Sequence, residues 1–259
     1  MLQARIIPCL LLHKGGLFKT VKFKKPRYIG DPINAVKIFN EKEVDELMII
    51  DIDATVEQRA PHYEKIEEIV SEAFMPVSYG GGIGNVTQMK QLFRNGVEKV
   101  SLSSAALNDT SLISEAVSIF GSQSVILTLD IKRSLFKRKY QIVTHNGTRN
   151  TGNDPIQTAK EFAQLGIGEL VINNVDNDGI MEGYDTEYMK QVVDAVNIPV
   201  VALGGAGNKD HLRDVVVDAG VSAAAAGSMF IYHGRRKAVL ISYPPQEDMQ
   251  KHLGEILHE

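Results

Sequence analysis

The chain has 259 residues, of which 44% are hydrophobic, and its formal net charge is −4. This length suits one large domain or two small ones, and the acidic balance argues against nucleic-acid binding. The single cysteine, Cys9, excludes a disulfide framework within the chain, and no apolar stretch approaches the ~20 residues of a membrane span. We therefore expect a cytoplasmic protein with no membrane partner.

Short β-rich runs alternate with helix-period segments along the chain. The expected strands cover residues 5–12, 46–51, 76–79, 99–102, 124–132, 169–173, 199–202 and 223–226. The expected helices cover residues 32–40, 62–71, 86–95, 111–120, 154–165, 186–195 and 209–219. Eight strand–helix units predict an α/β fold, a parallel (β/α)8 TIM barrel. A doubly wound open sheet is the alternative.

The two halves of the chain repeat one pattern, which favours the closed barrel. Gly81 lies 23 residues before Ser104, and Gly205 lies 23 residues before Ser228. We expect a single barrel domain over residues 1–259. Its half-barrels would cover about 1–121 and 122–245, with a C-terminal helix to 259.

Each half places glycines after one strand and small residues after the next. Glycine lets backbone N–H groups approach an anion, and a helix N-terminus adds its positive end. The pattern predicts a ligand with a phosphate at each end. The candidate phosphate-binding residues are Gly81, Gly82, Ser103 and Ser104 in the first half, and Gly204, Gly205, Gly227 and Ser228 in the second. Glycines that only permit tight turns are the alternative.

Segment 14–27 contains five lysines, one arginine and two glycines. Two interpretations of this segment stay open. It is either a solvated loop or a binder of small phosphorylated anions.

One position differs between the strands that open the two halves. Asp130 closes the second of these strands, and the equivalent residue in the first is Leu11. Two carboxylates facing each other across a barrel mouth would suit proton transfer on a sugar, one as acid and one as base. Only one is present here, so Asp130 is the candidate general acid or base. A structural aspartate is the alternative.

Several segments carry a family resemblance over essentially the whole chain, namely RIIPCL, DIDAT, YGGGI, GVEKVSL, GSQSVILTLDIKR, DNDGIMEGYD and ALGGAG. Together they resemble the cyclase (synthase) subunit of imidazole glycerol phosphate synthase. The resemblance implies a (β/α)8 barrel that receives ammonia from a glutaminase docked at its bottom. It also implies a lyase reaction that cleaves and cyclises a bis-phosphorylated ribulosyl aminoimidazole carboxamide, in histidine and purine metabolism.

The resemblance also assigns roles to single residues. Of the family's two catalytic aspartates, the second corresponds to Asp130 and the first to Leu11. Lys19 matches a further catalytic position, and Asp51 and Asp176 match positions that contact substrate.

Further departures fall at the same end of the expected barrel. Leu203 and Asn174 stand where the family has serines, and Tyr28 stands where it has an aspartate. Since lost acid–base help alone can cost ~10²–10⁴ in rate, these changes predict impaired cyclase chemistry.

At the bottom of the barrel, the resemblance implies a ring of two basic and two acidic residues that gates an ammonia tunnel. The matching residues are Arg5, Glu46, Lys99 and Glu169. All four are present, which predicts that the gate and the glutaminase docking face persist. A rim of ordinary ion pairs is the alternative.

The segments PCLLL, KFKKPRYIGDPINAVKIFNEKEVDEL, FMPVSYGGGI and RRKAVLISYP resemble one branch of this family, whose members accompany surface-polysaccharide genes. The resemblance implies a barrel that passes ammonia to a sugar amidotransferase, which makes an acetamidino group on a sugar.

Three hypotheses follow, in order of preference. The first is a non-cyclising subunit of a glutamine amidotransferase, favoured by Leu11. The second is a working cyclase that relies on Asp130, favoured by the glycine clusters and the gate charges. The third is a sugar-phosphate isomerase, which Leu11 disfavours and which leaves the gate charges unexplained. Histidine and cysteine spacings predict no metal site, and the glycine clusters lack the cofactor fingerprints of nucleotide-binding folds, so we expect no cofactor.

Overall fold

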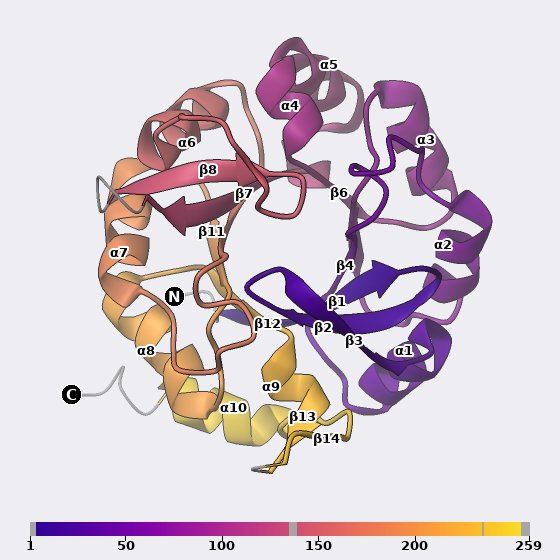
Figure 1. The fold of residues 1–259 in the computed structure, drawn as a ribbon, viewed down its shortest axis with the longest axis vertical. Helices are drawn as coiled ribbons and strands as arrows, with labels where there is room; N and C mark the ends of the chain where they lie inside the picture. The colour runs from indigo at the N-terminus through magenta and orange to yellow at the C-terminus, as the bar shows by residue number, and fades with distance from the viewer. Residues whose placement is uncertain (1–3, 135–138, 235, 255–259) are drawn as a thin grey trace.

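The computed structural model describes residues 4–134, 139–234 and 236–254. Its centre is a closed barrel of eight parallel strands, seen from its carboxyl end in Figure 1. In chain order these strands are β1 (Arg5–His13), β4 (Leu47–Asp51), β5 (Val77–Gly80), β6 (Lys99–Leu102), β7 (Val125–Arg133), β10 (Glu169–Asn174), β11 (Val200–Leu203) and β12 (Ala223–Ala226). Pairing of β10 with β7 and of β12 with β1 closes the sheet, so the predicted TIM-barrel fold is confirmed.

A ring of helices surrounds the barrel (Figure 1). The longer helices are α1 (Pro32–Glu41), α2 (Tyr63–Val70), α3 (Val86–Arg94), α5 (Ser111–Phe120), α6 (Pro155–Gln164), α7 (Thr186–Ala195), α8 (Lys209–Ala219) and α10 (Gln246–Gly254). Shorter helical turns are α4 (Ser104–Asn108), η1 (Ser122–Ser124) and α9 (Ser228–Ile231). The predicted C-terminal helix is present as α10, and its expected extension over 255–259 lies outside the described residues. None of the described helices has the length and apolar character needed to cross a membrane.

Helix caps repeat between the halves. Asp31 begins α1 by accepting a hydrogen bond from the N–H of Asn34, and Asp154 caps α6 in the same way. Asn85 and Asn208 cap α3 and α8. Such caps satisfy N–H groups that lack a partner within the helix. The two members of each pair lie 123 residues apart, as expected for two half-barrels with a common pattern.

The barrel carries antiparallel additions at its carboxyl end. β2 (Gly16–Val21) and β3 (Lys24–Gly30) form a hairpin on β1, while β8 (Tyr140–Thr144) and β9 (Arg149–Asn150) form one on β7. A third hairpin consists of β13 (Tyr232–His233) and β14 (Ala238–Val239). Segment 14–27 is therefore mostly a β-hairpin rather than a loop, and its binding of small phosphorylated anions stays a prediction.

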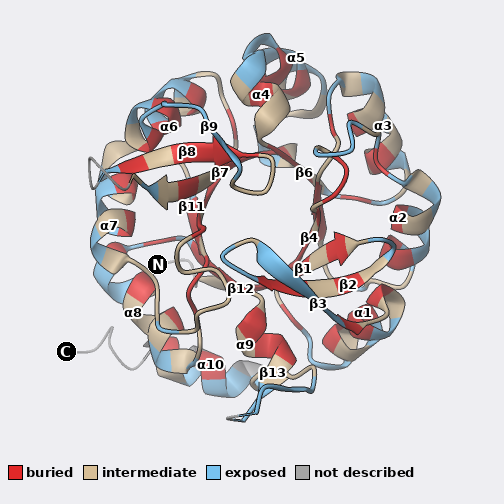
Figure 2. Ribbon diagram, viewed as in Figure 1, coloured by how far each residue is buried: buried red, intermediate tan, exposed pale blue. Residues whose placement is uncertain are grey.

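Two apolar clusters stabilise the barrel. The larger lies between the sheet and the helices, and Figure 2 shows buried positions along the strands and on parts of the surrounding helices. The smaller fills the lumen and consists of Ile7, Cys9, Met48, Ile126, Val171, Val201, Ala223 and Ala225. Side chains alternate across each strand, so one set faces the helices and the other faces the lumen.

Candidate active site

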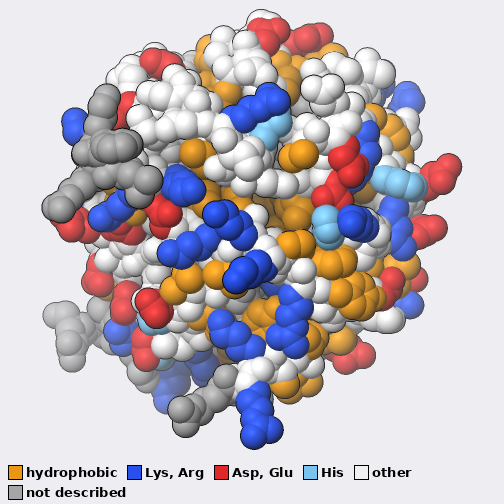
Figure 3. Space-filling view, viewed as in Figure 1, with side chains coloured by type: hydrophobic (Ala, Val, Ile, Leu, Met, Phe, Trp, Pro, Cys, Tyr) orange, Lys and Arg blue, Asp and Glu red, His pale blue; other side chains and the backbone are white. Residues whose placement is uncertain are grey.

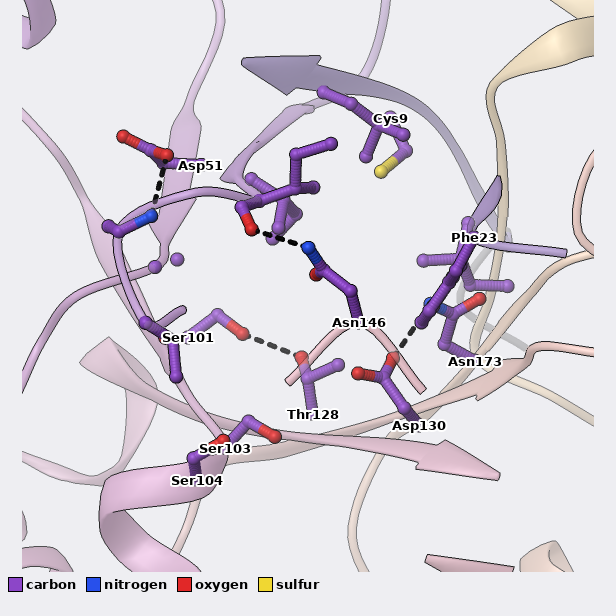
Figure 4. A pocket seen from close by; sticks show the side chains of 18 of the residues that line it. Cys9, Phe23, Asp51, Ser101, Ser103, Ser104, Thr128, Asp130, Asn146 and Asn173 are labelled. Carbon is purple, nitrogen blue, oxygen red and sulfur yellow. Dashed lines mark hydrogen bonds between the residues drawn. The ribbon is translucent and has the colours of Figure 1, made fainter. Parts of the chain in front are cut away.

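A cavity of about 450 Å³ opens at the carboxyl end of the barrel. Figure 3 shows this face, and Figure 4 shows side chains that line the cavity. It brings together most of the predicted site residues, namely Leu11, Lys19, Asp51, Gly81, Gly82, Ser103, Ser104, Asp130, Gly204, Gly205, Gly227 and Ser228. Function at the strand ends is general for this barrel type.

Leu11 and Asp130 lie on opposite sides of this cavity. Leu11 is on β1 and Asp130 on β7, and three strands separate β1 from β7 in either direction around the barrel. Both side chains line the cavity. The structure therefore places a hydrocarbon directly across the barrel from its carboxyl group.

Asp130 lies in an environment that disfavours its charged form. Burial raises the pKa of this carboxyl to about 7, and the nearby charge of Asp178 acts in the same direction. Asn173 opposes the shift, since its Nδ2 donates a 2.8 Å hydrogen bond to Asp130 Oδ1 (Figure 4). A carboxyl with a pKa near neutrality can both give and take a proton at working pH.

Lys19 reaches the cavity from β2. Its Nζ donates a 2.9 Å hydrogen bond to the backbone oxygen of Cys9, and burial lowers its pKa. Gly227 leaves room for this amine, because a Cβ at that position would collide with Lys19 Nζ. The position of Lys19 thus explains why residue 227, one of the predicted phosphate-binding residues, is a glycine.

Asp51 lines the cavity but is already paired. Arg59 Nη2 lies 2.9 Å from both of its carboxylate oxygens, and the N–H groups of Asp53 and Ala54 donate to Oδ1. These contacts hold the loop after β4. Arg59 was not foreseen from the sequence, since nothing local to it marks a cavity residue.

Asp176 is placed elsewhere than expected. In the described part of the chain it is not among the residues that line the cavity, and its carboxylate accepts a 2.8 Å hydrogen bond from the N–H of Arg133. Asp178, two residues later, lines the cavity instead. A turn follows β10 and contains both aspartates, and a role for Asp176 in contacting substrate stays a prediction of the family resemblance.

The glycines after β5 and β11 have equivalent surroundings. A Cβ on Gly81 would collide with the backbone oxygen of Asp51, and a Cβ on Gly204 would lie 2.6 Å from that of Asn174. In the structure, the counterpart of Gly81 is therefore Gly204. The spacing to Ser104 and Ser228 had matched Gly81 with Gly205, one residue later. Close approach of neighbouring loops suffices to explain these glycines.

Hydrogen bonds tie each large hairpin to a loop of the opposite half. Asp178, after β10, accepts from Thr20 Oγ1 at 2.8 Å and from the N–H of Phe23 at 3.2 Å. Asn146, between β8 and β9, donates at 2.9 Å to the backbone oxygen of Ile52, after β4 (Figure 4). Both hairpins therefore fold over the cavity edge.

A ring of charges closes the other end of the lumen. Arg5 pairs with Glu169 and lies 2.6 Å from Glu46, while Lys99 lies 2.8 Å from Glu46 and 3.4 Å from Glu169. Glu46 and Glu169 have side-chain exposures of 3% and 8%. The four residues predicted to form an alternating ring do meet, with the apolar lumen between them and the cavity.

Comparison with known proteins places this arrangement in a family. The family model described as "Histidine biosynthesis protein" matches residues 5–237. The chain belongs to this family. A Leptospira interrogans member named "Putative imidazole glycerol phosphate synthase subunit HisF" is 46% identical over 250 residues, which is 96% of this chain and 98% of the relative.

Two further members show the range of the family. A Pseudomonas aeruginosa protein named "Putative imidazole glycerol phosphate synthase subunit hisF2" is 48% identical over 244 residues, covering 94% of this chain and 97% of its own length. The imidazole glycerol phosphate synthase subunit HisF of Alkaliphilus metalliredigens is 37% identical over 233 residues, covering 90% and 92%. The chain is thus a HisF-like barrel subunit of the histidine biosynthesis family, with Leu11 facing Asp130.

Proposed function

We propose that this chain is the barrel subunit of a glutamine-dependent amidotransferase that conducts ammonia rather than cyclising a bis-phosphate. A glutaminase would dock on the face that holds the charged ring, and ammonia would travel through the lumen to the cavity. The observation that carries the proposal is Leu11 opposite Asp130, above an intact ring and an apolar lumen.

The lumen suits neutral ammonia. Its wall is hydrocarbon apart from Cys9 and a polar strip on the β5–β7 side, where Ser101 Oγ and Thr128 Oγ1 are 2.6 Å apart. Burying an ammonium ion in such surroundings costs several kcal/mol, whereas ammonia carries no charge to desolvate. The ring, in which each charge has opposite neighbours, would admit ammonia when one of its ion pairs opens.

Apolar side chains support a docking face around the ring. Phe74, in the segment between α2 and β5, is 89% exposed at the ring end of the barrel. Ile119, at the C-terminal end of α5, is 55% exposed near the same end. Aromatic residues such as Phe74 are enriched at protein–protein interfaces, which supports this end of the barrel as the docking face.

The finer assignment is delivery of ammonia to a sugar amidotransferase that forms an amidine on a surface-glycan sugar. The branch-specific segments support it, together with the loss of the carboxylate at position 11. A working cyclase of histidine biosynthesis is the second candidate. It is favoured by the cavity, which retains Asp130, Lys19 and both glycine clusters.

Ammonia-dependent consumption of the ribulosyl aminoimidazole carboxamide bis-phosphate separates the two candidates. We expect no turnover by the unaltered chain, since one member of the acid–base pair is a leucine. The Leu11→Asp variant restores the second carboxyl, and Leu11→Asn serves as a control that adds a polar side chain of the same shape at the same position without a carboxyl. Robust turnover by the unaltered chain would show a cyclase that relies on Asp130 and would overturn the conduit proposal.

A further inference from the structure

Two hairpins at the cavity face carry an unbalanced positive charge. Segments 14–30 and 232–246 together contain nine lysines and arginines and no aspartate or glutamate, in a chain of net charge −4. They form β2–β3 and β13–β14. Figure 3 shows basic side chains gathered over these elements, on the same face as the cavity. Lys22, Lys24 and Lys25 are all exposed.

The two hairpins form one continuous surface, which we call the two-hairpin face. Arg27 of β3 donates a 3.3 Å hydrogen bond to the backbone oxygen of Lys237, and its guanidinium lies 5.4 Å from the ring centre of Tyr232. Within the described part of the chain, no ion pair involves Arg27 or the exposed lysines of β2–β3. Their charge is therefore directed to solvent.

Apolar side chains lie among these cations. Tyr28 is 59% exposed and Leu240 is 55% exposed, and Val21 and Val239 are also exposed. Tyrosine and arginine are enriched where proteins bind one another. Lysine and proline often protect an edge strand such as β3 from pairing with other chains. That accounts for Lys24, Lys25 and the adjacent proline, but not for Arg27, Lys237 or the exposed apolar residues.

We propose that the two-hairpin face docks the acidic surface of the protein that receives ammonia at the cavity. This proposal rests on the proposed function and adds the location and charge of the contact. A partner seated here would cover the cavity mouth, so that ammonia leaving the lumen meets its acceptor before it meets bulk water. Complementary charge would also speed the encounter and select the partner.

A protein fits this face better than a polyanion does. Burying the exposed tyrosine, leucine and valine side chains against an apolar surface of a partner stabilises the complex. The net negative charge of the chain would repel a nucleic acid outside the patch. Anionic membranes and RNA are therefore competing outcomes of the test.

The experiment places a photo-crosslinking p-benzoylphenylalanine at Tyr28 in the full chain, expressed in its native cells. The same probe at Phe74, on the ring face, reports separately on the glutaminase. We expect the Tyr28 probe to form an adduct with one protein that has an acidic surface and an ammonia-accepting activity. The triple variant Lys22→Glu, Lys24→Glu, Lys25→Glu should abolish that adduct and leave the Phe74 adduct unchanged.

A matched variant reverses three exposed lysines on the helices, Lys90→Glu, Lys160→Glu and Lys190→Glu, and changes the net charge equally. With the crosslinked protein purified, the hairpin variant should bind at least about tenfold more weakly, and the helix variant should bind as the unaltered chain does. Added salt should weaken binding of the unaltered chain and of the helix variant, and it should have little effect on the binding that the hairpin variant retains.

Three results would overturn the proposal. In the first, the Tyr28 probe captures no protein. In the second, the Tyr28 adduct still forms in the hairpin variant. In the third, the chain binds phosphatidylglycerol vesicles or RNA, and the hairpin variant loses that binding while the helix variant keeps it. A Phe74 adduct with the glutaminase, accompanied by any of these, would leave the conduit function standing and remove only the docking surface.

Discussion

At the scale of single residues, Asp130 and its surroundings distinguish one side of the cavity from the other. Asp130 is held by Asn173 and lies near Asp178, while Leu11 fills the position across the barrel. A second carboxylate there would be able to exchange protons with substrate, and a leucine cannot. Asp130 therefore lines the cavity as an acid–base group whose pKa lies close to neutrality.

The raised pKa of Asp130 predicts a particular dependence of stability on pH. In the unfolded chain this carboxyl loses its proton near pH 4, whereas in the folded chain it keeps the proton to about pH 7. Between these values the folded state binds more protons, so its stability falls as pH rises.

Asp130→Asn removes this dependence and keeps an acceptor for Asn173. Urea unfolding at pH 5 and at pH 8 gives the free energy of unfolding of the unaltered chain relative to the variant. We expect this difference to fall by a few kcal/mol from pH 5 to pH 8, at about 1.4 kcal/mol per pKa unit. A difference that stays constant across this range would show that Asp130 titrates normally.

At the scale of elements, the two large hairpins exchange contacts between the halves. β2–β3 leaves β1 and is held by Asp178 after β10, and β8–β9 leaves β7 and is held through Asn146 at the loop after β4. The two contacts are related by the internal repeat, although the side chain belongs to the loop in one case and to the hairpin in the other.

Asp178→Ala should loosen β2–β3 selectively. It leaves Thr20 Oγ1 and the N–H of Phe23 without their acceptor, at a cost of ~1–3 kcal/mol. We expect amide hydrogen exchange over residues 17–30 to accelerate at least about tenfold, with no change over 140–150. Asn146→Ala is the matched variant and should give the opposite pattern. Unchanged exchange in both hairpins would mean that strand pairing alone holds them.

At the scale of the molecule, the barrel connects two ends of different character. The ring of Arg5, Glu46, Lys99 and Glu169 draws on both halves of the chain and seals one end. The apolar lumen leads from it to the open cavity. The ring links strands that are far apart in sequence. The free energy lost when one of its ion pairs is removed therefore measures how strongly the ring helps to close the barrel.

The ring should behave as a coupled unit. Lys99→Met leaves Glu46 and Glu169 with one cation fewer, and because the lysine is partly exposed we expect a loss of ~2–4 kcal/mol in the free energy of unfolding. Combining it with Glu46→Gln should cost less than the sum of the single changes, by at least about 1 kcal/mol. Additive losses in urea unfolding would indicate independent surface ion pairs.

The sequence by itself determined the barrel, the repeat, the charges at the strand starts and the leucine opposite Asp130. These features depend on residue type and on position along a strand, and both can be read from local periodicity. The family resemblance predicted roles for the ring and for Lys19, which position alone does not give.

Only the tertiary structure decided how the side chains at the cavity are used. Asp51 is held by Arg59, Asp176 turns away to Arg133, and Asp178 takes the place at the cavity that Asp176 was expected to fill. Segment 14–27 became a hairpin held by the opposite half of the chain. A hydrogen-bond partner is chosen by which loops approach in space, and no local pattern records that approach. The partners lie 8 residues apart in the pair Asp51 and Arg59 and 158 apart in the pair Thr20 and Asp178.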